Sequence, residues 1–378
     1  MSALALRPWL ASLLSLLTAC SAVPAPERFE FALPRSVQAP PVPADNLMSR
    51  AKVDLGRRLF WDRRLSADNS FACATCHRPE LAFTDGLVVA RGLSGEALPR
   101  NTPSLANVAY FSAYTWANPR LHTLEGQALV PLLASAPREL GVTKLMPEVC
   151  ARLAAEPDYV TRFAAAFPDA ATPISTATII AALASFERTL LSLSSPYDRH
   201  LAGDRRALSP AALRGKALFE SERLGCASCH AGPLLTDAEQ TPGQGDPPFH
   251  NVGLYDGAGR GLYPRDNPGL YEFTRKPSDM GRFRTPSLRN VTMTPPYMHD
   301  GSVATLDEVL DHYAAGGRTL ASGPYAGVGA HSRNKDSRIR GFMLSAGERS
   351  DLLAFLASLS DASFVGNPAF ADPFEPVR

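Results

Sequence analysis

Hydrophobic residues recur at helical spacing along several segments of this 378-residue chain. Apolar positions three or four residues apart predict helices, and no run of alternating apolar and polar residues predicts the strands of a large sheet. Ser209, which precedes Pro210, and Ser345 are of the type that caps the first turn of a helix. The pattern predicts a mainly α fold, with helices over residues 51–60, 174–193, 210–221, 306–314 and 346–359.

The N-terminus has the pattern of a secretion signal. Arg7 precedes an apolar run over residues 9–17 that is too short to span a bilayer. The run leads into Leu-Thr-Ala-Cys20, which resembles the cleavage box of bacterial lipoproteins, where the cysteine is acylated. We expect a lipoprotein-type signal peptide over residues 1–20 with a lipid anchor at Cys20. An ordinary signal peptide with an incidental cysteine is the alternative. Residues 21–46 are rich in proline and predict an extended tether.

Two Cys-x-x-Cys-His motifs are the most informative chemical feature. This spacing lets two thiols add across the vinyl groups of one haem while the adjacent imidazole binds the iron. A zinc site or a disulfide pair is the alternative. The motifs predict two covalently bound c-type haems and, because such haems are attached outside the cytoplasmic membrane, a periplasmic protein of a Gram-negative bacterium. Their residues are Cys73, Cys76, His77, Cys226, Cys229 and His230.

The cysteine that remains, Cys150, is expected to be a small buried hydrophobic residue. A net charge of +1 with 20% charged residues argues against a nucleic-acid partner. After the predicted signal peptide, the chain has no segment that is long and apolar enough to cross a membrane. We therefore expect the lipid anchor to be the protein's contact with the membrane.

An internal repeat predicts two tandem domains. Gly56-Arg-Arg-Leu-Phe60 precedes the first haem motif as Gly215-Lys-Ala-Leu-Phe219 precedes the second. Downstream, residues 102–108 match residues 285–291 at six of seven positions, and a Thr-Leu-acidic triplet follows each block. The chain therefore divides into cytochrome domains over residues 47–205 and 206–360 and a tail over residues 361–378.

The second copy carries an insertion, about residues 234–282, between its haem motif and the Thr-Pro-Ser-Leu block. It is rich in glycine and proline. Such composition predicts loops, which we place near the haem edge.

The order of these motifs resembles the bacterial di-haem cytochrome c peroxidase and MauG family over about residues 45–360. Its members carry Arg-Asn-Thr-Pro, a Trp, Leu-Glu-x-Gln and Glu-Leu-Gly between the haem motifs, and Pro-Pro-Tyr-Met-His-Asp-Gly after the second. Four stretches resemble most closely the MbnH branch, lipoprotein-like di-haem enzymes encoded beside methanobactin-associated copper proteins. These stretches are residues 116–119, 250–255, 271–274 and 311–317.

For the first haem, the resemblance implies an open or water-filled face. His77 matches the proximal ligand, and Leu93 stands where the peroxidases carry a distal histidine. A hydrocarbon cannot bind iron, so this haem should react with hydrogen peroxide directly. Gln127 and Glu139 match the distal pair that handles the peroxide, where proton transfer assists cleavage of the O–O bond. Trp116 matches the indole between the two haems; packing in the core is the alternative role.

For the second haem, the resemblance implies His230 as proximal ligand and Tyr313 where the peroxidases place a methionine. Phenolate is a hard anionic ligand that stabilises ferric and more oxidised iron. The adjacent His312 is the alternative ligand, although one residue along a helix turns a side chain by about 100°. Met298 and His299 lie in a proline-rich turn and are expected to pack or to bind a haem propionate.

The resemblance also implies a calcium ion between the domains. Asn101, Thr294 and Pro296 match its ligands, the last two through backbone carbonyls, and hard oxygen ligands suit this ion. No role is assigned to His200, His250 and His331, which we expect to be solvated or hydrogen-bonded.

Three functions compete. In the first, peroxide reacts at the first haem, the oxidising equivalents spread across both irons through Trp116, and a residue on a periplasmic partner protein is oxidised. The MbnH resemblance implies a tryptophan of a copper-binding partner, and the MauG resemblance implies maturation of a quinone cofactor. In the second, the protein is a detoxifying peroxidase fed by a small cytochrome. In the third, it is a non-enzymatic electron carrier. Leu93, Gln127 and Glu139 disfavour the carrier, and Tyr313 favours the first function over the second.

Overall fold

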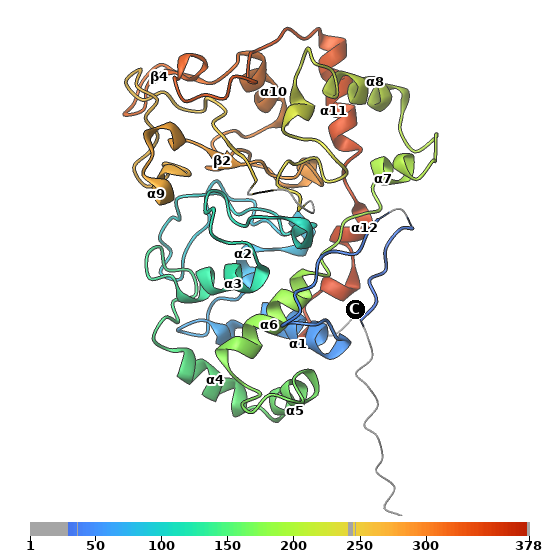
Figure 1. Cartoon of the computed structure of the whole chain (residues 1–378), viewed down its shortest axis with the longest axis vertical. Helices are drawn as coiled ribbons and strands as arrows, with labels where there is room; N and C mark the ends of the chain where they lie inside the picture. The colour runs from blue at the N-terminus through green and yellow to red at the C-terminus, as the bar shows by residue number, and fades with distance from the viewer. Residues whose placement is uncertain (1–28, 36, 241–244, 246, 376–378) are drawn as a thin grey trace, which may run out of the picture.

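The computed structural model describes residues 29–35, 37–240, 245 and 247–375. The signal peptide and Cys20 lie outside the described residues. The fold is mainly helical, as the hydrophobic pattern predicted, and the described strands form only two antiparallel pairs (Figure 1). These strands are β1 (Phe249–His250) with β2 (Phe283–Arg284), and β3 (Thr319–Leu320) with β4 (Gly327–Val328).

The helices divide between the two halves of the chain, which occupy the lower and upper parts of Figure 1. The first half contains α1 (Arg50–Trp61), α2 (Cys73–Cys76), α3 (Leu124–Leu133), α4 (Met146–Ala154), α5 (Pro157–Ala166) and α6 (Thr176–Glu187). The second half contains α7 (Pro196–Leu201), α8 (Pro210–Phe219), α9 (Tyr271–Thr274), α10 (Leu306–Ala314), α11 (Ala346–Ala357) and α12 (Ala362–Val365). Short 3₁₀ turns connect several of them.

The expected helix caps are confirmed, but one helix is shorter than the hydrophobic pattern predicted. The Ser209 and Ser345 hydroxyls accept from the backbone N–H groups of Ala212 and Glu348. Helix α6 ends at Glu187, although apolar residues continue to Leu193. Beyond it, the backbone pairs with Asn107, which donates its N–H to Leu190 O and accepts from Ser192 N through its side chain, at 2.8 Å each. A long-range partner therefore replaces the next helical turn.

Each copy is built on one close helix crossing, α1 with α6 and α8 with α11. A Cβ atom at Gly56 would lie 1.9 Å from Ala182 O, and one at Gly215 would lie 1.9 Å from Asp351 O. Only glycine allows this approach. The repeated Gly-x-x-Leu-Phe motif thus marks the same helix contact in both copies.

The backbone repeats as well. Asn107 and Asn290, equivalent in the two Thr-Pro-Ser-Leu blocks, have φ of 59° and 61°. Further along, Thr115 and Met298 are equivalent and have φ of 65° and 71°. Such positive values are uncommon for residues other than glycine, so their recurrence at matching positions supports an internal duplication.

The two copies contact each other reciprocally. Asn101 N donates to His299 O at 2.9 Å, and Arg284 N donates to Trp116 O at 2.8 Å. Asn101 and Arg284 are equivalent in the repeat, and so are Trp116 and His299. The contact therefore has approximate two-fold symmetry, with Trp116 and His299 at its centre.

The segment predicted as a C-terminal tail completes the core of the first copy. Phe364 and Phe370 are buried beside Phe83, with ring centroids 5.4 and 5.8 Å from it. The indole N–H of Trp61 donates to Phe370 O at 3.1 Å. Figure 1 shows this end of the chain beside α1 and α6. The reason is local: α1 and α6 leave an aromatic surface that the returning chain covers.

The described part of the proline-rich segment also lies against the protein. Gln38 O accepts from the Tyr110 hydroxyl at 2.7 Å. The buried Asn46 donates to Glu125 at 2.7 Å and to Ala181 O at 2.9 Å. Residues 38–46 are therefore anchored rather than a free tether. Within the described residues, no helix has both the length and the hydrophobicity needed to span a bilayer.

We expect Phe370→Ala to destabilise the protein by about 3–5 kcal/mol, because it removes a buried ring from an aromatic cluster. The neighbouring Phe374 is 41% exposed, so Phe374→Ala should cost about 1 kcal/mol or less. Urea unfolding of the two haem-loaded variants measures the difference. Equal midpoints would contradict a structural role for the returning segment.

Candidate active site

Both haem motifs hold their histidine in the same way. The Nδ1 atom of His77 lies 2.9 Å from Phe83 O, and that of His230 lies 3.0 Å from Leu235 O. A carbonyl oxygen only accepts, so each Nδ1 carries the hydrogen and each Nε2 keeps its lone pair. A backbone acceptor on the far nitrogen is the usual support of a metal-bound histidine.

The neighbouring cysteines are unpaired thiols. None of the cysteines that the structure describes forms a disulfide. Burial raises the pKa of Cys76 to about 12 and that of Cys226 to about 11. Cys150, expected to be buried, is half-buried against the first-copy core. The motif cysteines thus keep the S–H form that adds to a vinyl group, and the disulfide alternative has no support.

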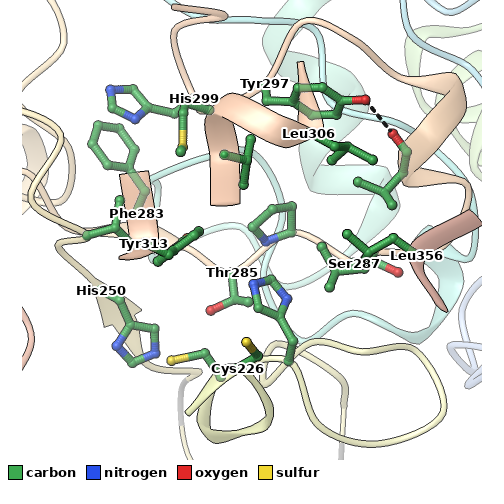
Figure 2. A pocket seen from close by; sticks show the side chains of 18 of the residues that line it. Cys226, His250, Phe283, Thr285, Ser287, Tyr297, His299, Leu306, Tyr313 and Leu356 are labelled. Carbon is green, nitrogen blue, oxygen red and sulfur yellow. Dashed lines mark hydrogen bonds between the residues drawn. The ribbon is translucent and has the colours of Figure 1, made fainter. Parts of the chain in front are cut away.

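A mainly apolar cavity opens above the second motif (Figure 2). Cys226, Cys229 and His230 lie on one side of it, and Tyr313 of α10 faces them. Tyr313 is half-buried, and its hydroxyl has no hydrogen-bond partner among the described residues; desolvation together with the two thiols raises the pKa of this phenol. An unpartnered phenol opposite an available imidazole fits a haem whose iron is bound from both faces.

The adjacent histidine points elsewhere. His312 Nε2 lies 3.0 Å from Val252 O, its Nδ1 is buried without a partner, and burial lowers the His312 pKa to about 4. Among the described residues that line the cavity, α10 contributes Tyr313 and not His312. The geometry favours Tyr313 as the ligand.

The equivalent helix of the first copy lacks this phenol. Thr123 caps α3 as Thr305 caps α10. Eight residues after the cap, Pro131 stands in α3 where Tyr313 stands in α10. Proline has no side-chain donor atom, so the internal repeat agrees with an open face on the first haem. Gln127, four residues after its cap, corresponds to Val309, which lines the second cavity.

Glu139 lies on a loop against the start of the first copy. Leu140 N donates to Pro131 O at 3.0 Å, and Leu140 O accepts from Ala67 N at 2.9 Å. Leu93 N donates to Arg138 O at 3.2 Å, which brings Leu93 beside this loop. Burial raises the pKa of Glu139, and this carboxyl acts electrostatically on both Cys73 and Cys76. A carboxyl with a raised pKa thus lies within electrostatic reach of the first motif.

Trp116 lies where the copies meet. It is buried, lines the second cavity, and donates its indole N–H to Asn101 O at 2.8 Å. Its ring meets that of His299 edge-on, with centroids 6.5 Å apart. His299 in turn stacks on Phe283, at a centroid distance of 3.5 Å, and burial lowers its pKa to about 4.

The three expected calcium ligands line one cavity. Asn101 uses its amide N–H to reach Leu87 O at 2.8 Å, which leaves its side-chain oxygen free of protein donors. Thr294 and Pro296 follow a 3₁₀ turn on the opposite copy. The three expected donors are neutral oxygens, which suit calcium in kind.

Of the histidines without an assigned role, only His250 enters a polar cluster. It lies 2.8 Å from Asp336 and 2.7 Å from Asp237, beside Cys229. His331 is exposed, and His200 is half-buried with an unpartnered Nδ1. The expected hydrogen-bonded or solvated state thus holds for His250 and His331, but not for Nδ1 of His200.

The family of the chain follows from comparison with known proteins. The family model for di-haem cytochrome c peroxidase matches residues 50–206. The chain is 39% identical to the methylamine utilization protein MauG of Methylorubrum extorquens over 331 residues, which cover 87% of this chain and 83% of that protein. It is 38% identical to a cytochrome-c peroxidase of Denitromonas iodatirespirans, over 85% and 84% of the two chains. The chain belongs to the di-haem cytochrome c peroxidase and MauG family.

A solved structure agrees with this assignment. The crystal structure of a MauG-like protein associated with microbial copper homeostasis has a TM-score of 0.89 and 48% identity, and the match covers 92% of this chain and all of that one. Membership in this di-haem family makes the protein an oxidoreductase and implies two c-type haems. The zinc alternative for the motifs therefore falls away.

Buried charged groups that sequence reasoning missed also fit haem. Arg188 pairs with Glu125 at 2.7 Å but leaves Nη1 buried without a partner, and Glu187 leaves Oε2 in the same state. Arg284 is buried with no carboxylate paired to it, and burial lowers its pKa to about 10. The carboxylates of a haem would provide partners for such guanidinium groups. The sequence did contain a sign of these buried charges, because the charged pair Glu187-Arg188 follows an apolar helical segment.

We expect Tyr313→Phe to convert the second haem from low spin to high spin, because it removes the oxygen atom that faces the cavity. His312→Ala is the matched control from the same helix and should leave that spectrum unchanged. Absorption and electron paramagnetic resonance spectra of the ferric proteins measure the outcome. The reverse pattern would assign the ligand to His312.

Proposed function

We propose that this protein is a periplasmic enzyme that uses hydrogen peroxide to oxidise a residue on a partner protein. The observation that carries the proposal is the asymmetry of the duplicated fold. Tyr313 faces the second haem motif, whereas the equivalent place in the first copy holds Pro131 and the expected distal position holds Leu93. One copy is thus suited to bind peroxide, and the other is suited only to exchange electrons.

In the first copy, Cys73 and Cys76 would attach the haem and His77 would hold its iron. When bound, the haem would supply the redox chemistry that cleaves the O–O bond of peroxide. Glu139 is the proton donor to the departing oxygen in this proposal, a role that the raised direction of its pKa supports. Gln127 orients the peroxide through its amide. Leu93 leaves the face of the haem open.

In the second copy, Cys226 and Cys229 would attach the haem, and His230 and Tyr313 would hold its iron. With both residues bound, this copy would have no place for peroxide. Its contribution is electron transfer, and Trp116, held by Asn101 at the contact between copies, is the group through which electrons pass.

The relatives of this chain suggest two candidates for the partner protein. Similarity at 48% identity to a MauG-like protein associated with copper homeostasis supports a copper-binding protein as partner. A tryptophan of that partner, which the MbnH resemblance implies, is the proposed oxidised residue. The second candidate is peroxide detoxification with a small cytochrome as electron donor, favoured by the 38% identity to a cytochrome-c peroxidase. The Tyr313 phenol favours the first candidate.

Two further groups belong to the proposal. A calcium ion bound by Asn101, Thr294 and Pro296 would link the copies through neutral oxygens. Acylation of Cys20 would attach the enzyme to a membrane, with residues 21–37 as the remaining tether. Mass spectrometry of the purified protein tests both the lipid and the metal.

We expect the ferric protein, as isolated, to contain one high-spin and one low-spin haem and to react with peroxide without prior reduction. The reason is the missing donor at Leu93 and Pro131. Electron paramagnetic resonance and stopped-flow absorption measure both properties. Two low-spin signals, with peroxide reactivity only after half-reduction, would contradict the open face.

We expect Trp116→Phe to retain both haems and the initial peroxide reaction but to lose oxidation of the partner. Glu139→Gln should instead slow the peroxide step by on the order of 10²-fold or more. Because the Glu139 pKa is raised, the wild-type rate should persist above the usual carboxyl range and fall as the pH rises through this pKa; the glutamine variant should lack that fall. Rapid turnover with a reduced small cytochrome, and no mass change in the partner, would favour detoxification.

A further inference from the structure

A continuous series of aromatic rings leads from Trp116 toward the surface of the second copy. Trp116 meets His299 at a centroid distance of 6.5 Å, and His299 meets Tyr263 at 6.2 Å. Tyr263 then meets Tyr255 at 5.3 Å, and Tyr255 meets Tyr325 at 5.9 Å. Each ring is thus in contact with the next.

The series runs from the interior to the outside. Tyr263 is 3% exposed and belongs to the same buried cluster as Trp116. Tyr255 and Tyr325 are half-buried, and Tyr325 lies in the loop between β3 and β4. An electron entering at Tyr325 would therefore reach Trp116 by steps between rings whose centroids are no more than 6.5 Å apart.

We propose that this aromatic series carries electrons from the protein surface at Tyr325 to Trp116, with Tyr255 as the residue on which the radical rests. The inference rests on the proposed function, because hydrogen peroxide bound at the first copy is the oxidant. It adds a route for the electrons and a place on the surface where the donor acts.

Tyr255 is singled out by its hydrogen bond. Its hydroxyl donates to Asp300 Oδ2 at 2.6 Å, so a carboxylate is in position to take the phenolic proton when the ring loses an electron. The Tyr263 hydroxyl donates to Asn251 Oδ1 at 2.8 Å, an amide oxygen that is a poor base. Tyr263 therefore acts as a bridge, whereas Tyr255 can form a neutral radical.

A positive charge next to Tyr255 reinforces this difference. The Arg318 guanidinium lies 4.6 Å from the ring centroid and is fixed by Leu254 O and Ser302. This cation opposes a positive charge on the ring, so removal of the electron must be accompanied by removal of the proton. Asp300 provides the acceptor for that proton.

The electrons and protons balance. Hydrogen peroxide takes up two electrons and two protons and leaves as two water molecules. Each electron that passes from Tyr255 toward Trp116 moves the phenolic proton onto Asp300. An electron from Tyr325 then reduces the Tyr255 radical, and the proton returns from Asp300. The external donor, a phenol or indole side chain of the partner, loses one electron and one proton per passage.

The test uses the haem-loaded protein without a partner. It is mixed with limiting hydrogen peroxide and frozen for electron paramagnetic resonance, and a parallel sample is digested to map oxidised peptides by mass spectrometry. We expect a tyrosyl radical in the wild type and oxidation products at Tyr255 and Tyr325. Tyr255→Phe should remove the radical signal and the products at Tyr325, and Asp300→Asn should diminish both. Absorption spectra of the ferric haems check that each variant is folded and loaded.

Tyr271→Phe is the matched control, because Tyr271 lies on α9 in the same insertion and, among the described residues, its ring contacts Arg275 and no member of the aromatic series. It should leave the radical and the products unchanged. Undiminished oxidation of Tyr325 in Tyr255→Phe would overturn the proposal, as would loss of the radical in Tyr271→Phe alone. Oxidation of the partner that is lost in Trp116→Phe but intact in Tyr255→Phe would overturn the aromatic route while leaving the proposed function standing.

Discussion

The reciprocal pair of backbone hydrogen bonds between the two copies is the constraint on which the rest of the structure depends. Asn101 N to His299 O and Arg284 N to Trp116 O fix the copies with approximate two-fold symmetry. Buried N–H and C=O groups must be paired, so neither segment can shift without breaking both bonds. The same bonds hold Trp116 and His299 in ring contact, and they complete the wall of the second cavity with residues from the first copy.

Duplication supplies two equivalent scaffolds, and a few substitutions give them different chemistry. The crossing at Gly56 and Gly215, and the acceptor on each motif histidine, are the same in both copies. What differs is the residue eight positions after the helix cap: Pro131 in one helix and Tyr313 in the other. Because the backbone is shared, the proposed difference in reactivity would come from side chains and not from a change of fold.

Local pattern and motif spacing were sufficient for five helices (α1, α6, α8, α10 and α11), for the internal repeat and for the haem motifs, but α3, α4, α5 and α7 were not predicted. The glycine that recurs before each haem motif marks the close helix crossing in each copy, because only glycine allows the two backbones to approach so closely. The sequence could not show that Phe364 and Phe370 return to the first copy, or that Asn107 ends α6, because both depend on partners far away along the chain. The roles of Gln127, Glu139 and Trp116 came from resemblance and stay predictions, although burial of Glu139 and Trp116 agrees with them.

The insertion in the second copy makes the contact between Trp116 and His299 asymmetric, because it adds aromatic rings on one side only. At its centre, Trp116 and His299 are equivalent positions, so the duplicated fold alone would offer electrons no preferred side. Residues 234–282 have no counterpart of this length in the first copy, and they supply Tyr255 and Tyr263, which extend the ring contacts beyond His299. Aromatic side chains held in glycine-rich loops are difficult to explain by packing alone, because shorter loops would cover the same core. The proposed route begins on the second copy, so a bulky protein donor would not need to enter the first copy, where the proposed function places the peroxide.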